Sequence, residues 1–203
     1  MRNTFDRFNG RHQDYQAARP SYAQEFLDWL GELYAPPERY TAADIGSGTG
    51  KLSAQLLAAG FRVCGVEPNP DMRGAAEALL GGDPRFSSSN GTDHDTGLPD
   101  RSVDMVAAAQ AFHWFDGPAF ARECRRILRP GGRAVLVWNV RGSAPMNQAL
   151  AQVFREHCPS FHGFTGGMGE DDPRIRDFFG GAYEKRRFPN PLTLDRDQRS
   201  EEH

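Results

Sequence analysis

Short apolar runs alternate with segments of helical period through the middle of this chain, and no other feature constrains its fold as strongly. The segments between the runs place apolar side chains three or four positions apart, as one face of a helix requires. Strands and helices in alternation favour right-handed βαβ units on a parallel sheet. The expected strands are Tyr40–Ile45, Phe61–Glu67, Arg85–Ser89, Val103–Ala109 and Ala134–Val140, and the expected helices are Lys51–Ala59, Asp71–Leu80, Ala119–Leu128 and Asn147–His157.

The sequence therefore predicts an α/β fold with a doubly wound, mostly parallel sheet and helices on both faces. Its 203 residues favour a single domain. Within that domain we expect an N-terminal lid and helix over residues 1–36, and a core sheet over residues 37–158. An irregular cap is expected over residues 159–181, followed by one more strand at Tyr183–Phe188 and a shortened end within 159–203.

Composition and charge exclude several classes of protein. Lys and Arg number 24 against 27 Asp and Glu, and this net charge of −3 argues against a nucleic-acid binder with a basic surface. No run reaches the roughly 18 apolar residues that a transmembrane helix needs, and the first residues are too polar for a secretory signal. The three cysteines form no CxxC pair, which favours a reducing compartment. We expect a cytoplasmic protein without nucleic-acid or membrane partners.

Three glycines at alternate positions, Gly46, Gly48 and Gly50, join an expected strand to an expected helix. Glycine lets a ligand approach the backbone closely, and the helix that follows offers free N–H groups. The pattern does not match a P-loop, and Lys51 stands where the third glycine of a GxGxxG dinucleotide fingerprint would fall. What remains is D-x-G-x-G-x-G, with Asp44 at the strand end. Because an acid repels phosphate and attracts ammonium, this loop is predicted to bind a ligand with an amino group and no phosphate.

A second acid lies at the tip of the next expected strand. Glu67 stands near the spacing at which a carboxylate takes ribose hydroxyls in doubly wound folds. A carboxylate that accepts two hydroxyl protons selects an unphosphorylated ribose. Because both acids are present, a ligand-binding loop is favoured over an ordinary strand-to-helix turn.

Four motifs of this chain resemble those of the class I S-adenosylmethionine (SAM)-dependent methyltransferases, both in sequence and in their order along the chain. Residues 109–115 and 14–22 are similar to the subgroup that contains small-molecule and trans-aconitate-type methyltransferases. The resemblance covers residues 5–195 and implies SAM as the cofactor. The four motifs are Asp44–Gly50, Val66–Pro68, Leu98–Asp104 and Ile127–Gly132.

The resemblance implies a role for each acid. Asp44 would face the methionine amino group of SAM, and Glu67 would take the ribose diol. The adenine should meet the turn after the third strand, where Thr92 or Asp93 would accept from its amino group, although the local order departs from the family's usual pattern. Gln110 would contact the methionine end. The expected cofactor residues are Asp44, Gly46, Ser47, Gly48, Gly50, Glu67, Pro68, Thr92, Asp93 and Gln110.

The acceptor should lie past the fourth strand, beside His113 and Trp114. His113 would hydrogen-bond the acceptor or remove its proton, or else it packs and caps the next helix. Tyr15 and Arg19 precede the first helix, and as a lid they would hold the acceptor, with Arg19 paired to a carboxylate. A structural tether with Arg19 on the surface is the alternative. Two acids flank His94, but nothing else supplies a matching ligand, so no metal site is predicted.

We therefore predict methyl transfer from SAM to a small molecule, at a carboxylate oxygen. Methylation of a quinone-like or phenolic acceptor stays open, with His113 as its base. A SAM-binding protein without turnover also stays open. The family closes its sheet with an antiparallel strand pair, and little chain follows Tyr183–Phe188 to form the second strand of that pair. An incomplete pair leaves a bare sheet edge, which would favour self-association. A NAD-dependent dehydrogenase is disfavoured by Lys51.

Overall fold

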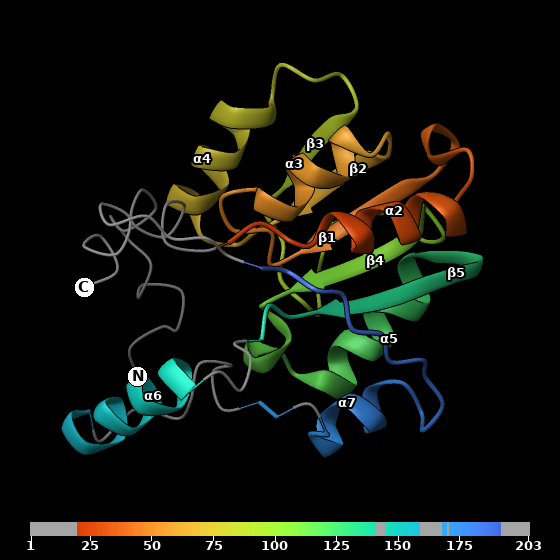
Figure 1. Ribbon diagram of the computed structural model, residues 1–203. Helices are drawn as coiled ribbons and strands as arrows, with labels where there is room; N and C mark the ends of the chain where they lie inside the picture. The colour runs from red at the N-terminus through yellow and green to blue at the C-terminus, as the bar shows by residue number, and fades with distance from the viewer. Residues whose placement is uncertain (1–19, 141–144, 159–167, 170, 192–203) are drawn as a thin grey trace.

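Figure 1 shows the computed structural model as a central sheet between two layers of helices, and the structure describes residues 20–140, 145–158, 168, 169 and 171–191. The elements in chain order are α2 (Gln24–Leu33), a 3-10 turn (Pro37–Arg39), β1 (Thr41–Ile45), α3 (Lys51–Ala58), β2 (Arg62–Val66), α4 (Pro70–Leu80), β3 (Phe86–Ser89), β4 (Val103–Ala109), a second 3-10 turn (Phe112–Trp114), α5 (Gly117–Ile127), β5 (Leu128–Val137), α6 (Pro145–His157) and α7 (Pro173–Phe178). The five strands run parallel in the order β3-β2-β1-β4-β5. The predicted doubly wound α/β fold is confirmed.

Alternation along each strand sends side chains to two separate cores. On β4, Met105 and Ala107 pack in one cluster with residues of α2 and α3, whereas Val106 and Ala108 pack in the other with residues of α5 and α7. Figure 1 shows α2, α3 and α4 on one side of the sheet and α5 and α7 on the other. A strand buried on both faces needs apolar residues at successive positions, which explains why the residues of β4 are apolar except for Asp104 near its start.

The strand order reverses between β1 and β4. In open sheets of this kind, ligands bind outside the carboxyl ends of the strands at such a reversal. The chain segments that leave β1, β2, β3 and β4 all begin at this edge, because the strands are parallel. The fold thus brings the glycine loop and the expected acceptor turn to the same edge of the sheet.

The fifth strand begins earlier than predicted. It starts at Leu128 instead of Ala134, and α5 ends at Ile127. Val103 pairs with Leu128, but Met105 pairs with Arg133, so the register shifts between these two pairs. The Pro-Gly-Gly sequence over residues 130–132, which follows the expected helix, therefore forms an irregularity inside the strand.

The expected irregular cap contains a helix where the structure describes it. Asp172 caps α7 by accepting the Arg174 N–H at 2.9 Å, and Pro173 occupies the first turn. Ile175 and Phe178 are buried, and the ring of Phe178 stacks on Phe120 of α5 at 5.1 Å. The prediction of an irregular segment is wrong here, because these two apolar side chains bury against α5; residues 159–167 and 170 lie outside the described residues.

The segment predicted as a last strand, Tyr183–Phe188, has no strand pairing. Instead, Phe188 packs against Phe26 and Trp29 of α2 at 5.8 and 5.9 Å between ring centroids, and Arg186 lies over Trp29. The prediction of a strand is wrong because the side chains of this segment pack on a helix. Among the described residues, β5 pairs with β4 alone and forms the edge of the sheet.

Candidate functional site

The glycine loop leaves β1 and enters α3 through three residues with positive φ. Gly46, Gly48 and Gly50 have φ values of 70°, 56° and 83°. The N–H groups of Gly46 and Ser47 both donate to the carbonyl oxygen of Val66, at 2.9 and 3.2 Å. These bonds fix the loop against the carboxyl end of β2.

The glycines of this loop serve different purposes. A Cβ on Gly46 would lie 2.8 Å from the Cβ of Ala111, which is too close for any real contact. A Cβ on Gly48 would meet nothing nearer than the Met72 sulfur at 3.7 Å. Packing therefore requires glycine at position 46, whereas Gly48 presents open backbone that a ligand can approach.

Asp44 is a buried acid one residue before the end of β1, with 1% of its surface exposed. Its Oδ2 accepts from the Ser53 hydroxyl at 2.7 Å, and its Oδ1 is buried without a hydrogen-bond partner among the described residues. Burial raises the pKa of Asp44 to about 6, and the Glu67 carboxylate acts in the same direction. An orphaned carboxylate oxygen is costly in the interior, and a cationic ligand group would satisfy it.

The structure thereby identifies Ser53 as a site residue that the sequence had not suggested. It is fully buried on α3, one helical turn before Leu57 on the same face. The signal was present as one polar residue on an otherwise apolar helix face.

Glu67 follows β2 directly and already accepts two backbone N–H groups. Its Oε2 accepts from Gly48 and its Oε1 from Asn69, both at 2.9 Å. Burial raises the pKa of Glu67, and the two N–H donors oppose that shift. Since two carboxylate oxygens offer about four acceptor positions, Glu67 holds the glycine loop and keeps capacity for further donors.

Arg73 of α4 joins the ends of β2 and β3. Its Nη1 donates to the carbonyl oxygens of Glu67 and Pro68 at 2.8 and 3.3 Å and to Oδ1 of Asn90 at 3.1 Å. Asn69 caps the same helix by accepting from the N–H groups of Asp71 and Met72. No sequence pattern indicated the Arg73 contacts, because one partner, Asn90, lies on a different strand connection.

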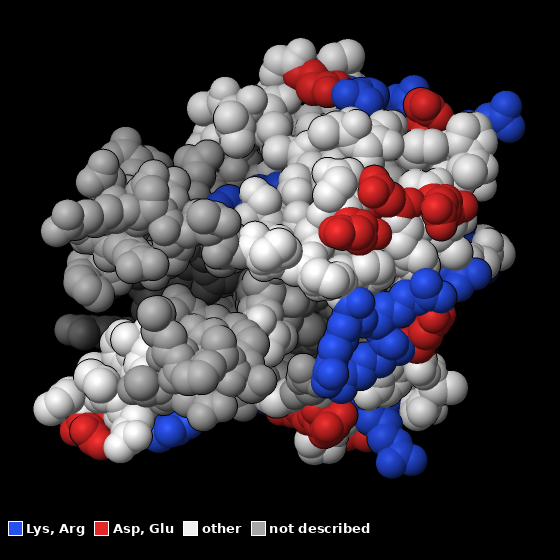
Figure 2. Space-filling view, viewed as in Figure 1, with Lys and Arg blue, Asp and Glu red and all other residues white. Residues whose placement is uncertain are grey.

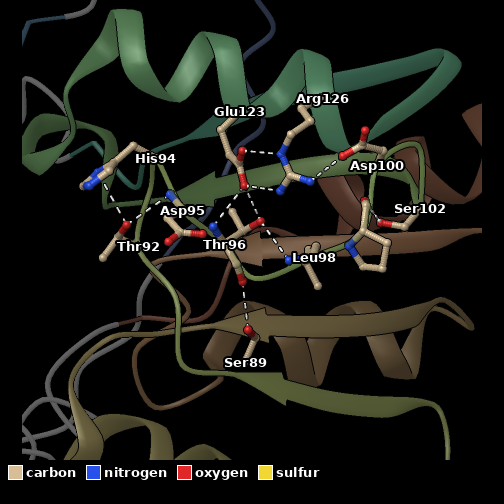
Figure 3. Close-up of polar contacts among 11 residues, drawn as sticks. Ser89, Thr92, His94, Asp95, Thr96, Leu98, Asp100, Ser102, Glu123 and Arg126 are labelled. Atoms are coloured by element: carbon tan, nitrogen blue, oxygen red, sulfur yellow. Dashed lines mark hydrogen bonds and ion pairs between the residues drawn. The ribbon is translucent and has the colours of Figure 1, made fainter.

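A tight turn over residues 92–95 connects β3 towards β4 (Figure 3). The Thr92 N–H donates to the Asp95 carbonyl at 2.8 Å, and the Thr92 hydroxyl accepts the Asp95 N–H at 3.1 Å. The Asp93 Oδ2 accepts the N–H of Asp116 at 3.0 Å, and its Oδ1 lies 3.1 Å from Nδ1 of His94. Asp93 therefore joins this turn to the start of α5, in addition to any contact with a ligand.

Gln110 follows β4 in the left-handed region, with φ of 55°. Such backbone is uncommon outside glycine and gathers at functional sites. Its N–H donates to the Val137 carbonyl at 2.9 Å, and its Nε2 donates to the Asn139 carbonyl at 3.2 Å. Gln110 is thus fixed between the carboxyl ends of β4 and β5.

His113 and Trp114 lie on the 3-10 turn after β4, with ring centroids 4.8 Å apart. Trp114 exposes 49% of its surface, and His113 is half-buried. The next residue, Phe115, borders the glycine loop, since a Cβ on Gly46 would lie 3.2 Å from its ring. The expected acceptor turn and the expected cofactor loop are therefore in contact.

Every predicted site residue that the structure describes lies at the carboxyl end of a strand or on the connection that follows it. Tyr15 and Arg19 lie outside the described residues. Within the described part of the chain, no three His, Cys, Asp or Glu side chains gather as a metal site. No helix in that part has the length and apolar content to cross a membrane.

Comparison with known proteins shows which proteins this chain is similar to. A family of methyltransferase domains matches residues 43–136. An uncharacterized methyltransferase of Mycobacterium tuberculosis is 42% identical over 127 residues, which are 63% of this chain and 49% of that protein. This chain therefore spans about half the length of that curated relative.

Two solved structures extend the likeness to the fold. One, assigned as a type II methyltransferase from Anaeromyxobacter dehalogenans, is 33% identical, with a TM-score of 0.56 over 87% of this chain and 70% of that one. The other, assigned as a methyltransferase of an antibiotic biosynthesis pathway in Anabaena variabilis, is 25% identical, with a TM-score of 0.61 over 82% of this chain and 63% of that one. Both likenesses extend beyond the matched domain.

Proposed function

This chain belongs to the class I SAM-dependent methyltransferases, and we propose that it binds SAM at the carboxyl edge of its sheet and transfers a methyl group to a small molecule. Membership rests on the matched methyltransferase domain and on the 33% identity with the Anaeromyxobacter structure. The observation that carries the cofactor proposal is the orphaned, buried Oδ1 of Asp44.

The residues at this edge fit SAM chemically. The methionine end of SAM carries an ammonium group, which a buried carboxylate such as Asp44 would attract. A phosphate at the same place would be repelled, which disfavours NAD. Glu67 would accept the ribose hydroxyls, and the open backbone at Gly48 would allow the ligand to approach.

The remaining proposed cofactor residues lie around Asp44 and Glu67. Ser47 and Pro68 flank the two acids, Thr92 and Asp93 lie on the side proposed for adenine, and Gln110 lies on the side proposed for methionine. When bound, SAM supplies an electrophilic methyl group on a sulfonium, and the transfer is an in-line displacement. The contribution of the protein is then mainly to position the two reactants.

For the acceptor, we propose a carboxylate oxygen of a small molecule, as in the trans-aconitate-type subgroup. Such an acceptor needs no base, so His113 and Trp114 would bind and orient it. A phenolic or quinone-like acceptor is the second candidate, and there His113 would take the proton. The name of the Anabaena relative, which refers to antibiotic biosynthesis, supports a small molecule in either case. A cytoplasmic location is part of this proposal.

Replacing Glu67 tests the cofactor site. Glu67→Ala removes the proposed diol acceptor, and a hydrogen bond to a charged group contributes about 1.5–3 kcal/mol. We expect the affinity for S-adenosylhomocysteine, the demethylated product, to fall about ten- to a hundredfold in titration calorimetry. Glu32→Ala, on the exposed side of α2, is the control and should bind like the wild type. Unchanged affinity in Glu67→Ala would remove this residue from the site.

Replacing Arg19 tests the acceptor class. If its guanidinium pairs with a substrate carboxylate, Arg19→Lys should not restore activity, because Lys lacks the planar bidentate fork. The measurement is methyl transfer to a panel of carboxylic acids by the wild type, Arg19→Lys and Arg19→Ala, with cofactor affinity unchanged in all three. Equal activity in the three proteins would move the acceptor towards neutral or phenolic molecules.

A further inference from the structure

We propose that Glu123 of α5 is a positioning residue for the adenosine half of the cofactor, because its contacts with Thr96 hold the turn over residues 92–95 against α5. This inference rests on the proposed function, in which that turn meets the adenine. Glu123 itself need not touch the ligand.

Glu123 is the buried centre of a polar network that reaches the surface at Arg126 and Asp100 (Figure 3). It is 6% exposed, and its Oε1 accepts both the N–H and the hydroxyl of Thr96, at 2.9 and 2.5 Å. Arg126 donates to both carboxylate oxygens, through Nε at 2.8 Å and Nη2 at 2.7 Å, and its Nη1 donates to Asp100 at 2.7 Å. Glu123 and Arg126 thus link one turn of α5 to two points of the connection between β3 and β4, Thr96 and Asp100.

Thr96 is the point at which this network holds the turn. The Thr96 carbonyl accepts from the Ser89 hydroxyl at 2.8 Å, which closes the turn back onto the end of β3. A Cβ on Gly91 would lie 2.5 Å from the same carbonyl oxygen, so the two sides of the turn are in contact. Fixing Thr96 therefore fixes Thr92 and Asp93 as well.

The same helix holds the tip of the turn. Asp93 accepts the N–H of Asp116, and Asp116 caps the start of α5. The base and the tip of the turn are thus held by one rigid element, through Glu123 and Asp116. Residues 90–102 form no helix or strand of their own, so these contacts supply order that secondary structure does not.

The charge of Glu123 suits this task. Burial alone would raise its pKa, but the hydrogen bonds from Arg126 and Thr96 outweigh burial and hold the pKa at about 2. The carboxylate is therefore ionised throughout the neutral range. Hydrogen bonds to an ionised acceptor are the stronger kind, so the turn is held firmly in the range where the protein would work.

Substitutions of Glu123 and Thr96 test the proposal. Glu123→Gln keeps the size of the side chain and removes its charge, and Thr96→Val removes the hydroxyl donor while Thr96→Ser keeps it. We expect Glu123→Gln and Thr96→Val to weaken the binding of S-adenosylhomocysteine and of adenosine by the same factor, about tenfold or more, by analogy with residues that hold metal ligands in place. Thr96→Ser should bind both like the wild type. Asp44→Asn should weaken S-adenosylhomocysteine and leave adenosine unchanged, since Asp44 faces the other half of the ligand.

Asp104 provides the matched control. Its carboxylate also accepts a backbone N–H, from Thr41 at 2.8 Å, and an arginine N–H, from Arg129 at 2.7 Å, but at the opposite edge of the sheet. Asp104→Asn should lower the melting temperature without changing adenosine affinity.

The possible results distinguish a failure of the proposed function from a failure of this inference alone. If the wild type does not bind S-adenosylhomocysteine, the proposed function fails, and this inference fails with it. If the wild type binds and Glu123→Gln binds adenosine equally well, the inference alone is overturned. An equal loss of adenosine affinity in Glu123→Gln and Asp104→Asn would also overturn it, because general destabilisation would then be the cause.

Discussion

A Gly46→Ala variant is expected to lose a large part of its folding stability. The methyl group would lie 2.8 Å from the Cβ of Ala111 and 3.2 Å from the Phe115 ring, in a backbone with φ of 70°. A positive φ costs a residue with a Cβ about 1–2 kcal/mol, and overpacking a filled site adds about 1–3 kcal/mol. We expect a total loss of about 2–5 kcal/mol, measured as the free energy of unfolding in urea.

Gly48→Ala is the control for this prediction. Gly48 also has a positive φ, but its Cβ would meet nothing closer than 3.7 Å. We therefore expect the backbone cost alone, about 1–2 kcal/mol, so that this variant folds and Gly46→Ala is clearly less stable. Equal losses in the two variants would show that the contact between the glycine loop and Ala111 does not exist as described.

An Asp44→Asn variant is expected to bind S-adenosylhomocysteine about thirtyfold or more weakly, while the free protein becomes more stable. The affinity falls because removing one partner of a buried charge pair costs about 2–5 kcal/mol. The stability rises because burial holds the pKa of Asp44 at about 6 in the folded chain, against 3.8 for an ordinary Asp. The folded state therefore keeps its proton to a higher pH than the unfolded chain.

The pH dependence of this stability difference has a definite sign. Between about pH 4 and 6 the folded wild type binds more protons than the unfolded chain, so this group makes stability fall as pH rises through that window. Above pH 6 the full cost applies, on the order of 1–3 kcal/mol. Asp44→Asn should exceed the wild type in melting temperature at pH 8, and the difference should vanish at pH 4. A variant that is less stable than the wild type at pH 8 would contradict this assignment.

The affinity of the wild type should follow the same ionisation. Below pH 6 the ligand's ammonium group must displace a proton from Asp44, so binding should weaken about tenfold for each further pH unit. The Asp44→Asn variant should show no such dependence over this range.

The sequence predicted the core strands well because burial on both faces leaves a simple mark. β4 has the predicted bounds, Val103–Ala109, since its residues are apolar except for Asp104 and the flanking residues Ser102 and Gln110 are polar. β5 differs because Pro130 and the two glycines after it are typical of a turn, whereas here they form an irregularity within a paired strand. α7 was missed because six residues are too few to show a helical period.

The residues of the candidate site also differ in whether a local sequence pattern marks them. Asp44, Glu67 and the three glycines could be found because strand ends and fixed spacings mark them. Glu123 could not, because its partner Thr96 lies 27 residues earlier and the two meet only when α5 packs beside the connection between β3 and β4. Long-range polar contacts of this kind leave no local pattern in one sequence.

Titration calorimetry of the wild-type chain with S-adenosylhomocysteine at pH 8, and with NAD in a parallel titration, tests the central claim most directly. A chain that uses Asp44 and Glu67 to hold an amino-bearing, unphosphorylated nucleoside should bind one molecule of S-adenosylhomocysteine and no NAD. Binding of NAD, or of neither compound, would contradict the account.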